Sequence, residues 1–586
     1  MSRSVSSGHL LTLRRSFKAR AILALMFIGA AGDAQAQPAP ALQGSPLPRI
    51  LPAPPPAVSR PSPTAPAPLP AEAAPAANVK VTSIGLVGAT AFPQAELLTL
   101  AGISVGPTVP LATVEAGRLA ILNRYRADGY VLTTVSASLD AQGALRFSVI
   151  EGRIVDVKLD GDIGPAGTQV LRFLRHLTAI GPVRNADLER WLLLAQDVPG
   201  VSLHAVLQPS AEDPGALSLV AQVHRQTLSG LLTADNRGYR LAGPEQALAV
   251  LDVNSLTQFG ERTEFSFYGT ARTTQLFGQA STELFVGGSG LKVRLYAGHG
   301  ETTPSGFLGA IGYDGTTTVF GVSASYPVIR SRQQTLNVTA AFDAVESEIT
   351  TAQTGIDQRL SRDSLRVLRA GGDYVSEDLL LGAERSAVNL VSLRLSHGLD
   401  GLGSTDQSNP NPGRPGERID FFKATAALSR TQTLFTPWTG ASVALKGVVS
   451  GQASGDKLPP TEKFYLGGAE FNRGFYSGQA TGDQAVTYTA ELQLNTSFDT
   501  AIAGSALNIP AQLYVFYDGG RAWQNTKLEP NVRLGSEGLG LRLNVTDATE
   551  FGVEGVIRNT RTFGGTSAQV RPLPANAIYW RALARF

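Results

Sequence analysis

Arg473 and Asp518 are the two side chains of this sequence whose surroundings suggest a specific ionic contact. Arg473 stands between Asn472 and Gly474 in the stretch 464–483, FYLGGAEFNRGFYSGQATGD, and Asp518 follows the apolar run 513–516. A guanidinium offers five donors in a rigid fork that fits one carboxylate, and glycines let backbones approach closely. Each motif alone is also typical of a surface turn or a strand end. Together they predict an arginine–carboxylate pair that joins two distant segments.

The sequence offers little support for catalysis or for a bound cofactor. Its six histidines are scattered without metal-ligand spacing, and it contains no G-x-S-x-G motif, no P-loop and no strand-to-helix G-x-G-x-x-G motif. Cysteine is absent, which excludes thiol nucleophiles and zinc–thiolate sites. The charge is nearly balanced, 50 basic against 48 acidic residues, which argues against a nucleic-acid binder. We therefore predict no catalytic residue, metal, cofactor, nucleotide or nucleic acid.

The first 77 residues predict an export signal followed by a tether. Residues 1–36 combine a basic lead, an apolar run over 21–31 and a small-residue cleavage site at 34–36, the pattern of a signal peptide. A membrane anchor is the alternative, but the run is too short to span a bilayer. Residues 37–77 are rich in Pro and Ala, which predicts an extended periplasmic linker without a packed core. This proline content disfavours a helix that would plug a pore.

Residues 78–225 show one order of elements twice. In the copy over 78–152, a strand (79–84) precedes helices at 94–101 and around 114–125, and strands follow at 130–139 and 144–150. In the copy over 153–225, a strand (154–159) precedes helices at 168–177 and 185–196, and strands follow at 201–207 and 216–223. The period of roughly 75 residues indicates an internal repeat of two β-α-α-β-β domains.

Motifs in the first copy are similar to those of a known family. Tyr125, Gly129 and Tyr130 form a Y-x-x-x-G-Y pattern, and Glu151-Gly152 ends a v-x-E-G pattern. Both resemble the signatures of polypeptide-transport-associated (POTRA) domains, and more narrowly those of two-partner secretion transporters of the haemolysin secretion/activation type. The stretches 233–238 and 254–260 resemble the same family, so the resemblance runs from about residue 79 to the C-terminus.

From residue 226 to residue 586 the helical period disappears. Segments of about ten residues alternate between apolar and polar side chains and are separated by turns, the signature of a membrane β-barrel. A soluble β-sandwich is the alternative, since it would bury the apolar face in a core. The export signal, the absence of cysteine and the C-terminal segment favour a transmembrane antiparallel barrel of about sixteen strands in outer-membrane lipid.

The C-terminal segment 578–586, IYWRALARF, has apolar residues at alternate positions and ends on an aromatic ring. It resembles the recognition strand of outer-membrane barrels, with Trp580 and Phe586 as the marked aromatics. This resemblance implies the barrel-assembly machinery as a partner during biogenesis.

The family resemblance also implies roles for the two motifs around Arg473 and Asp518. In the family, a loop after the eleventh strand or so folds into the barrel, and its arginine pairs with the aspartate of an F-x-D-x-G motif. Here Arg473, Gly474 and Phe475 match the loop tip, and Phe516, Asp518 and Gly520 match the wall motif. The sequence departs from the family by having Asn472 in place of valine and Phe475 in place of tyrosine, which removes a hydroxyl. We call residues 464–483 the lock segment.

An anchor of this kind has a physical purpose. Fixing a loop costs about 1–2 kcal/mol per residue in conformational entropy, and an exposed ion pair returns only about 0–1 kcal/mol. A partly desolvated, bidentate pair gives more and is directional. We therefore expect Arg473 and Asp518 to fix the lock segment in the lumen.

The resemblance implies an outer-membrane transporter that secretes one large, unfolded partner of the haemolysin or adhesin type. Its POTRA domains would lie in the periplasm and hold the client by adding its extended chain to a sheet edge. Two alternatives remain. A barrel-assembly insertase shares the POTRA type and the lock motif, although it has a longer POTRA array. A passive porin needs neither POTRA repeats nor a lock segment.

Overall fold

The computed structural model describes residues 77–352, 355–502, 505–565 and 573–586. The predicted signal peptide at 1–36 and nearly all of the predicted linker at 37–77 lie outside these residues.

The first domain is a three-stranded sheet covered by two helices. Its sheet has the order β2-β5-β4, in which β2 pairs in parallel with β5 and β4 pairs antiparallel with it. A separate two-stranded sheet joins β1 and β3. The elements are β1 (Asn78–Val81), β2 (Ser83–Val87), α2 (Gln94–Ala101), β3 (Gly106–Pro110), α3 (Leu111–Ala127), β4 (Thr134–Leu139) and β5 (Ala144–Ile150).

Two predicted strands of this domain have different bounds in the structure. The strand expected over 79–84 divides at Thr82, whose N–H donates to the carbonyl of Gly143. The strand expected over 130–139 begins only at Thr134, because residues 130–133 form a turn in which the Thr133 N–H donates to the Tyr130 carbonyl. Strand β3 was not predicted.

The second domain repeats the topology, with the sheet order β6-β8-β7. The helix expected over 168–177 is broken at Arg175 into two, and the helix over 185–196 forms as expected. The elements are β6 (Arg153–Asp160), α4 (Ala166–Leu174), α5 (His176–Ala179), α6 (Asn185–Gln196), β7 (Val201–Pro209) and β8 (Ala216–Arg225). Within the described residues, none of the helices has the length and apolar character needed to cross a bilayer.

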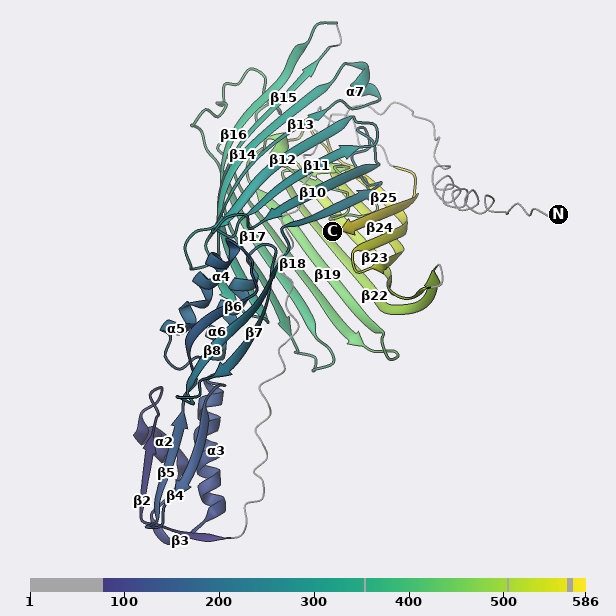
Figure 1. Ribbon diagram of the computed structural model, residues 1–586. Coiled ribbons are helices and arrows are strands. Elements are labelled where there is room, and N and C mark those ends of the chain that lie inside the picture. The colour runs from purple at the N-terminus through teal and green to yellow at the C-terminus, as the bar shows by residue number, and fades with distance from the viewer. Residues whose placement is uncertain (1–76, 353–354, 503–504, 566–572) are drawn as a thin grey trace, which may run out of the picture. The chain divides into compact units, whose positions relative to one another are not determined.

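Sixteen strands of the described residues close a barrel of antiparallel neighbours, which confirms the predicted fold class (Figure 1). The last strand, β26, closes the ring by pairing with the first, β9, over five residue pairs from Arg581↔Asp235 to Arg585↔Leu231. The strands are β9 (Leu228–Asp235), β10 (Gln246–Asn254), β11 (Arg262–Thr270), β12 (Gln275–Phe285), β13 (Lys292–Thr302), β14 (Asp314–Arg330), β15 (Gln334–Thr351), β16 (Gln358–Asp378), β17 (Ala387–Gly398), β18 (Phe422–Phe435), β19 (Ser442–Ser454), β22 (Gln484–Ile502), β23 (Ser505–Trp523), β24 (Asn531–Thr546), β25 (Thr549–Phe563) and β26 (Asn576–Arg585).

The alternation of side chains along the strands separates the two faces of the wall. Leu393 and Leu492 are exposed, whereas Ser396 and Glu491 on the opposite face of the same strands are buried. Several strands are much longer than the ten residues expected, up to the 21 of β16. A strand of that length exceeds what a tilted crossing of the hydrocarbon layer needs, so part of it stands outside the membrane.

The lock segment follows the eleventh barrel strand, β19, and precedes β22. It begins after a short 3-10 helix, η1 (Pro460–Glu462), and forms a narrow hairpin from β20 (Phe464–Leu466) and β21 (Ala480–Gly482). Phe464, Leu466 and Phe475 are buried in one apolar cluster with Val532 and Leu534 of β24. The segment is therefore folded against the barrel wall.

Candidate functional site

Arg473 reaches Asp518 as the sequence led us to expect. Its Nε lies 3.1 Å from Oδ2 and its Nη2 lies 3.1 Å from Oδ1, and its backbone N–H donates to Oδ2 at 2.9 Å. The Thr489 hydroxyl donates to Oδ1 at 2.9 Å. Asp518 on β23 is fully buried and Arg473 is 8% exposed. The contact is thus bidentate and desolvated, the geometry in which charge-assisted hydrogen bonds are strongest.

A second carboxylate, Glu491 of β22, also pairs with Arg473 and was not predicted. It is 1% exposed, and Arg542 Nη1 lies 3.2 Å from its other oxygen. The alternation along 488–495 places Glu491 on the polar face of its strand, but nothing in the sequence distinguishes it from other polar-face residues. The guanidinium therefore lies between two buried carboxylates.

The backbone carbonyls of the tip are bound as well. Arg237, which follows β9, donates from Nε to the Arg473 carbonyl at 3.0 Å and pairs with Glu554 of β25. Arg558 Nη1 and the Tyr579 hydroxyl each donate to the Gly474 carbonyl at 3.0 Å. Of these residues, Arg237 lies in the stretch 233–238 and Tyr579 in the C-terminal segment 578–586, both of which the sequence had marked, whereas Glu554 and Arg558 lie in neither. The tip thus contacts side chains from both ends of the barrel sequence.

The two motif glycines allow neighbouring side chains to lie directly against their backbone. A Cβ on Gly474 would lie 2.3 Å from the Cβ of Ser536, and a Cβ on Gly520 would lie 2.3 Å from Oδ1 of Asn472. Asn472 itself has a φ of 57°. Asparagine tolerates this left-handed backbone, whereas valine, with its branched Cβ, does not. The departure from the family pattern at this position therefore fits the local backbone.

The motif aromatics surround the arginine with apolar surface. The Arg473 guanidinium carbon lies 4.0 Å from the ring centre of Phe516, a cation–π distance. Phe475 is fully buried in the apolar cluster of the lock segment, an environment that requires no hydroxyl.

The POTRA signature residues gather inside the first domain. Glu151 accepts hydrogen bonds from the Tyr125 hydroxyl at 2.6 Å and from the N–H groups of Thr90 and Ala91, both at 2.9 Å. Burial opposes the ionisation of Glu151, but these donors outweigh it and lower its pKa below the ordinary value. The Tyr130 ring packs edge-on against Tyr125, Gly129 follows α3, and Gly152 follows Glu151.

The two marked aromatics of the C-terminal strand lie near the closure of the barrel. The backbone N–H of Trp580 donates to Asn236 Oδ1 at 2.9 Å, and the backbone N–H of Phe586 donates to the Gly230 carbonyl at 3.1 Å. The Phe586 ring is 65% exposed. Their role in biogenesis stays a prediction.

The site is built for holding a loop. Among the described residues, no group of three or more His, Asp and Glu side chains is placed to bind a metal ion. The three carboxylates described around the tip, Asp518, Glu491 and Glu554, each pair with an arginine.

Comparisons with known proteins agree with this architecture. The family model described as "Haemolysin secretion/activation protein ShlB/FhaC/HecB" matches residues 216–543, more than half of the chain, and one described as "POTRA domain, ShlB-type" matches residues 79–152. No curated protein sequence matches the chain.

Two solved structures share the fold over the whole length. CdiB from Escherichia coli has a TM-score of 0.65 and 14% identity, with 99% of this chain and 100% of that chain covered. CdiB from Acinetobacter baumannii has a TM-score of 0.58 and 15% identity, with both chains fully covered. At such low identity the likeness shows the fold alone.

Proposed function

The chain belongs to the haemolysin secretion/activation family, and from this premise we propose that it exports one large partner polypeptide of the haemolysin or adhesin type, in unfolded form, through its barrel. It is a two-partner secretion transporter of the outer membrane, and its POTRA domains lie in the periplasm. The family is one of transporters, and for this chain we propose that no catalysis, cofactor or nucleotide takes part.

The lock is the observation that carries the proposal. Arg473 makes three hydrogen bonds to Asp518 within the barrel, and its guanidinium also pairs with Glu491. A passive pore has no need of such an anchor. We infer that Arg473, Gly474, Phe475, Phe516, Asp518 and Gly520 together hold the lock segment in the conformation that permits transport.

The POTRA sheets offer edges for the client. In the orders β2-β5-β4 and β6-β8-β7, the outer strands have one side without a neighbour in the sheet. An extended polypeptide pairs with such an edge through its backbone groups. This mode of capture suits an unfolded client because it requires no particular side chains. Folding of the client outside the cell then supplies the driving force, as the family resemblance implies.

Deleting the protein tests the function directly. We expect one large protein to disappear from the culture medium while the other outer-membrane proteins keep their levels. A general loss of outer-membrane proteins would instead indicate an insertase. A large, steady conductance of the purified protein in planar bilayers, unaffected by Arg473→Ala, would indicate a porin.

A further inference from the structure

A second group of buried charges lies at the opposite end of the lock segment from Arg473. Lys463 stands just before the segment and Asp483 is its last residue. Between them lie Glu529, from the loop 524–530 after β23, and Arg414, from the loop 399–421 after β17. We call Lys463, Glu529, Arg414 and Asp483 the base cluster.

The base cluster forms a chain of alternating charges. Lys463 Nζ lies 2.8 Å from Glu529 Oε2, and Arg414 Nε lies 2.8 Å from Glu529 Oε1. Arg414 also reaches Asp483 with two nitrogens, at 2.7 and 3.2 Å. Arg414 therefore bridges two carboxylates, one on the lock segment and one on a neighbouring loop.

All four side chains of the base cluster are withdrawn from solvent, with exposed fractions between 0 and 9%. Two positive and two negative groups balance one another, and the remaining Asp483 bonds come from the N–H groups of Leu458 and Asn525 at 2.9 and 2.7 Å. Removing one partner of such a buried set leaves a charge without compensation, which is strongly destabilising. The base of the lock segment is thus held by contacts that share no residue with the tip.

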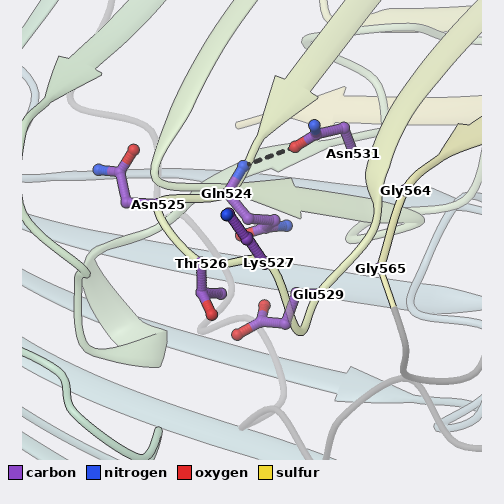
Figure 2. A pocket seen from close by; sticks show the side chains of 8 residues that line it. All are labelled: Gln524, Asn525, Thr526, Lys527, Glu529, Asn531, Gly564 and Gly565. Atoms are coloured by element: carbon purple, nitrogen blue, oxygen red, sulfur yellow. Dashed lines mark hydrogen bonds between the residues drawn. The ribbon is translucent and has the colours of Figure 1, made fainter.

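Solvent reaches the cluster from one side. Figure 2 shows Glu529 among Gln524, Asn525, Thr526 and Lys527 in the loop between β23 and β24, where they help to line a pocket of about 640 Å³ with Gly564 and Gly565. The other three members of the cluster do not line this pocket.

The wall supplies a further contact next to the base. Glu462, one residue before Lys463, pairs with Arg369 of β16 and Lys423 of β18, each at 2.7 Å. The entry to the lock segment is therefore attached to the barrel wall, while Arg414 attaches its exit.

We propose that Arg414 is a positioning residue that closes the base of the lock segment, so that the segment moves as a hairpin about a fixed base when its tip leaves Asp518. The inference rests on the proposed function in taking the lock segment as the part that moves during transport. Its test measures the position of the segment and does not require a client.

Because the chain contains no cysteine, single-cysteine reporters are unambiguous. In barrel order, β17, β19 and β23 are the ninth, eleventh and thirteenth strands. The chain enters the first strand from the periplasmic POTRA domains, so the loops after odd strands lie on the other side of the membrane, outside the cell. We place one reporter at the base, Ala480→Cys in β21, where the alanine is 4% exposed. The other, Ser477→Cys, lies near the tip. Their reaction with a membrane-impermeant maleimide is measured on intact cells.

Arg414→Gln should raise the labelling rate of the base reporter by about tenfold or more, because reaction at a buried site follows the population of the open form. Arg473→Ala should raise labelling of the tip reporter and leave the base reporter protected. Arg418→Gln is the matched control, since Arg418 lies in the same loop but is 53% exposed and pairs with Asp420. It should change neither reporter.

The double variant Arg414→Gln with Asp483→Asn distinguishes two explanations, the loss of a bridge and the loss of charge balance. It removes one positive and one negative group, so that Lys463 and Glu529 remain as a pair without net charge. Labelling of the base reporter stays high in this variant if Arg414 acts as a bridge. Protection restored in the double variant, or a labelling rate of the base reporter in Arg414→Gln within about twofold of the parent, overturns the proposal.

Heat-modifiable gel mobility shows that each variant has a folded barrel. Normal secretion by Arg473→Ala together with a reactive base reporter in Arg414→Gln would refute the function proposed for the tip and retain that of Arg414.

Discussion

Glu151 in the first POTRA domain and Asp518 in the barrel are both buried carboxylates, yet their partners differ in kind. Glu151 accepts hydrogen bonds from two N–H groups, the Thr90 hydroxyl and the Tyr125 hydroxyl, all neutral donors of its own domain. Asp518 accepts three hydrogen bonds from Arg473, a charged residue on a loop 45 positions away in the sequence.

The difference separates a structural contact from one that can be released. Most donors to Glu151 are backbone N–H groups or the hydroxyl of Tyr125 on α3, and these groups move away only when the domain unfolds locally. In our proposal, Arg473 belongs to a hairpin that moves about a fixed base, so its charge is solvated again by water when the tip leaves Asp518. Buried ion pairs stabilise less than their Coulomb energy suggests because desolvation offsets it. A lock built from them is therefore specific in position without being permanent.

Of the substitutions in the barrel, we expect Arg473→Ala to reduce secretion the most. Charge-assisted hydrogen bonds contribute about 1.5–3 kcal/mol each, so the loss of several should reduce secretion of the partner by about tenfold or more. The amount of partner in the medium measures this. Arg533→Ala, an exposed arginine on β24, is the control. Unchanged secretion in Arg473→Ala would show that the contact is only structural, like that of Glu151.

The sequence predicted some of the residues that form the two networks, around Glu151 and around Arg473, but not all of them. Glycines and aromatics around Arg473 and Asp518 marked that pair, and the motif Y-x-x-x-G-Y with E-G marked Tyr125 and Glu151. Alternation with period two predicted the barrel, since each strand must present an apolar face to lipid and a polar face to the lumen.

Glu491, Glu554, Arg558 and Arg414 could not be predicted in the same way. Polar-face residues look alike along a strand, and which of them meets the tip depends on strand register and on how deeply the loop enters. The same holds for Arg414, whose partners Asp483 and Glu529 lie 69 and 115 positions away in the sequence. The lengths of the barrel strands were also underestimated, because β14, β15 and β16 extend over 17, 18 and 21 residues with the same alternation.

Glu151→Ala tests the structural side of the comparison. It leaves the N–H groups of Thr90 and Ala91 and the Tyr125 hydroxyl without a partner, at about 1–3 kcal/mol each, so the domain should lose about 3 kcal/mol or more. Hydrogen exchange of the two amides in the full chain measures the loss. Glu115→Ala is the control, because its pair with Arg118 is a partly exposed helix contact. Amides that stay protected in Glu151→Ala would mean that the network does not hold the domain together.

The acid dependence of the same domain should follow from the lowered pKa of Glu151. A carboxyl whose pKa is lower in the folded state stabilises that state above its ordinary pKa of 4.5, and this contribution is lost as the pH falls through the folded value. Protection of the Thr90 and Ala91 amides should therefore decline below pH 4.5 in the parent chain. Glu151→Gln should show weaker protection at neutral pH and a flatter decline. Parallel pH profiles for the two chains would assign the acid sensitivity to another group.

Glu491→Gln should have the smallest effect and sharpens the comparison most. The variant keeps the shape of the side chain and removes one of the two charges facing Arg473, while the three hydrogen bonds to Asp518 remain. We expect secretion to fall by about two- to threefold, the loss of one hydrogen bond partly retained by the amide. Asp518→Asn, which weakens three hydrogen bonds at once, should lie between this variant and Arg473→Ala. If Glu491→Gln reduced secretion as strongly as Arg473→Ala, the charge between the two carboxylates, and not the bidentate contact with Asp518, would be what holds the tip.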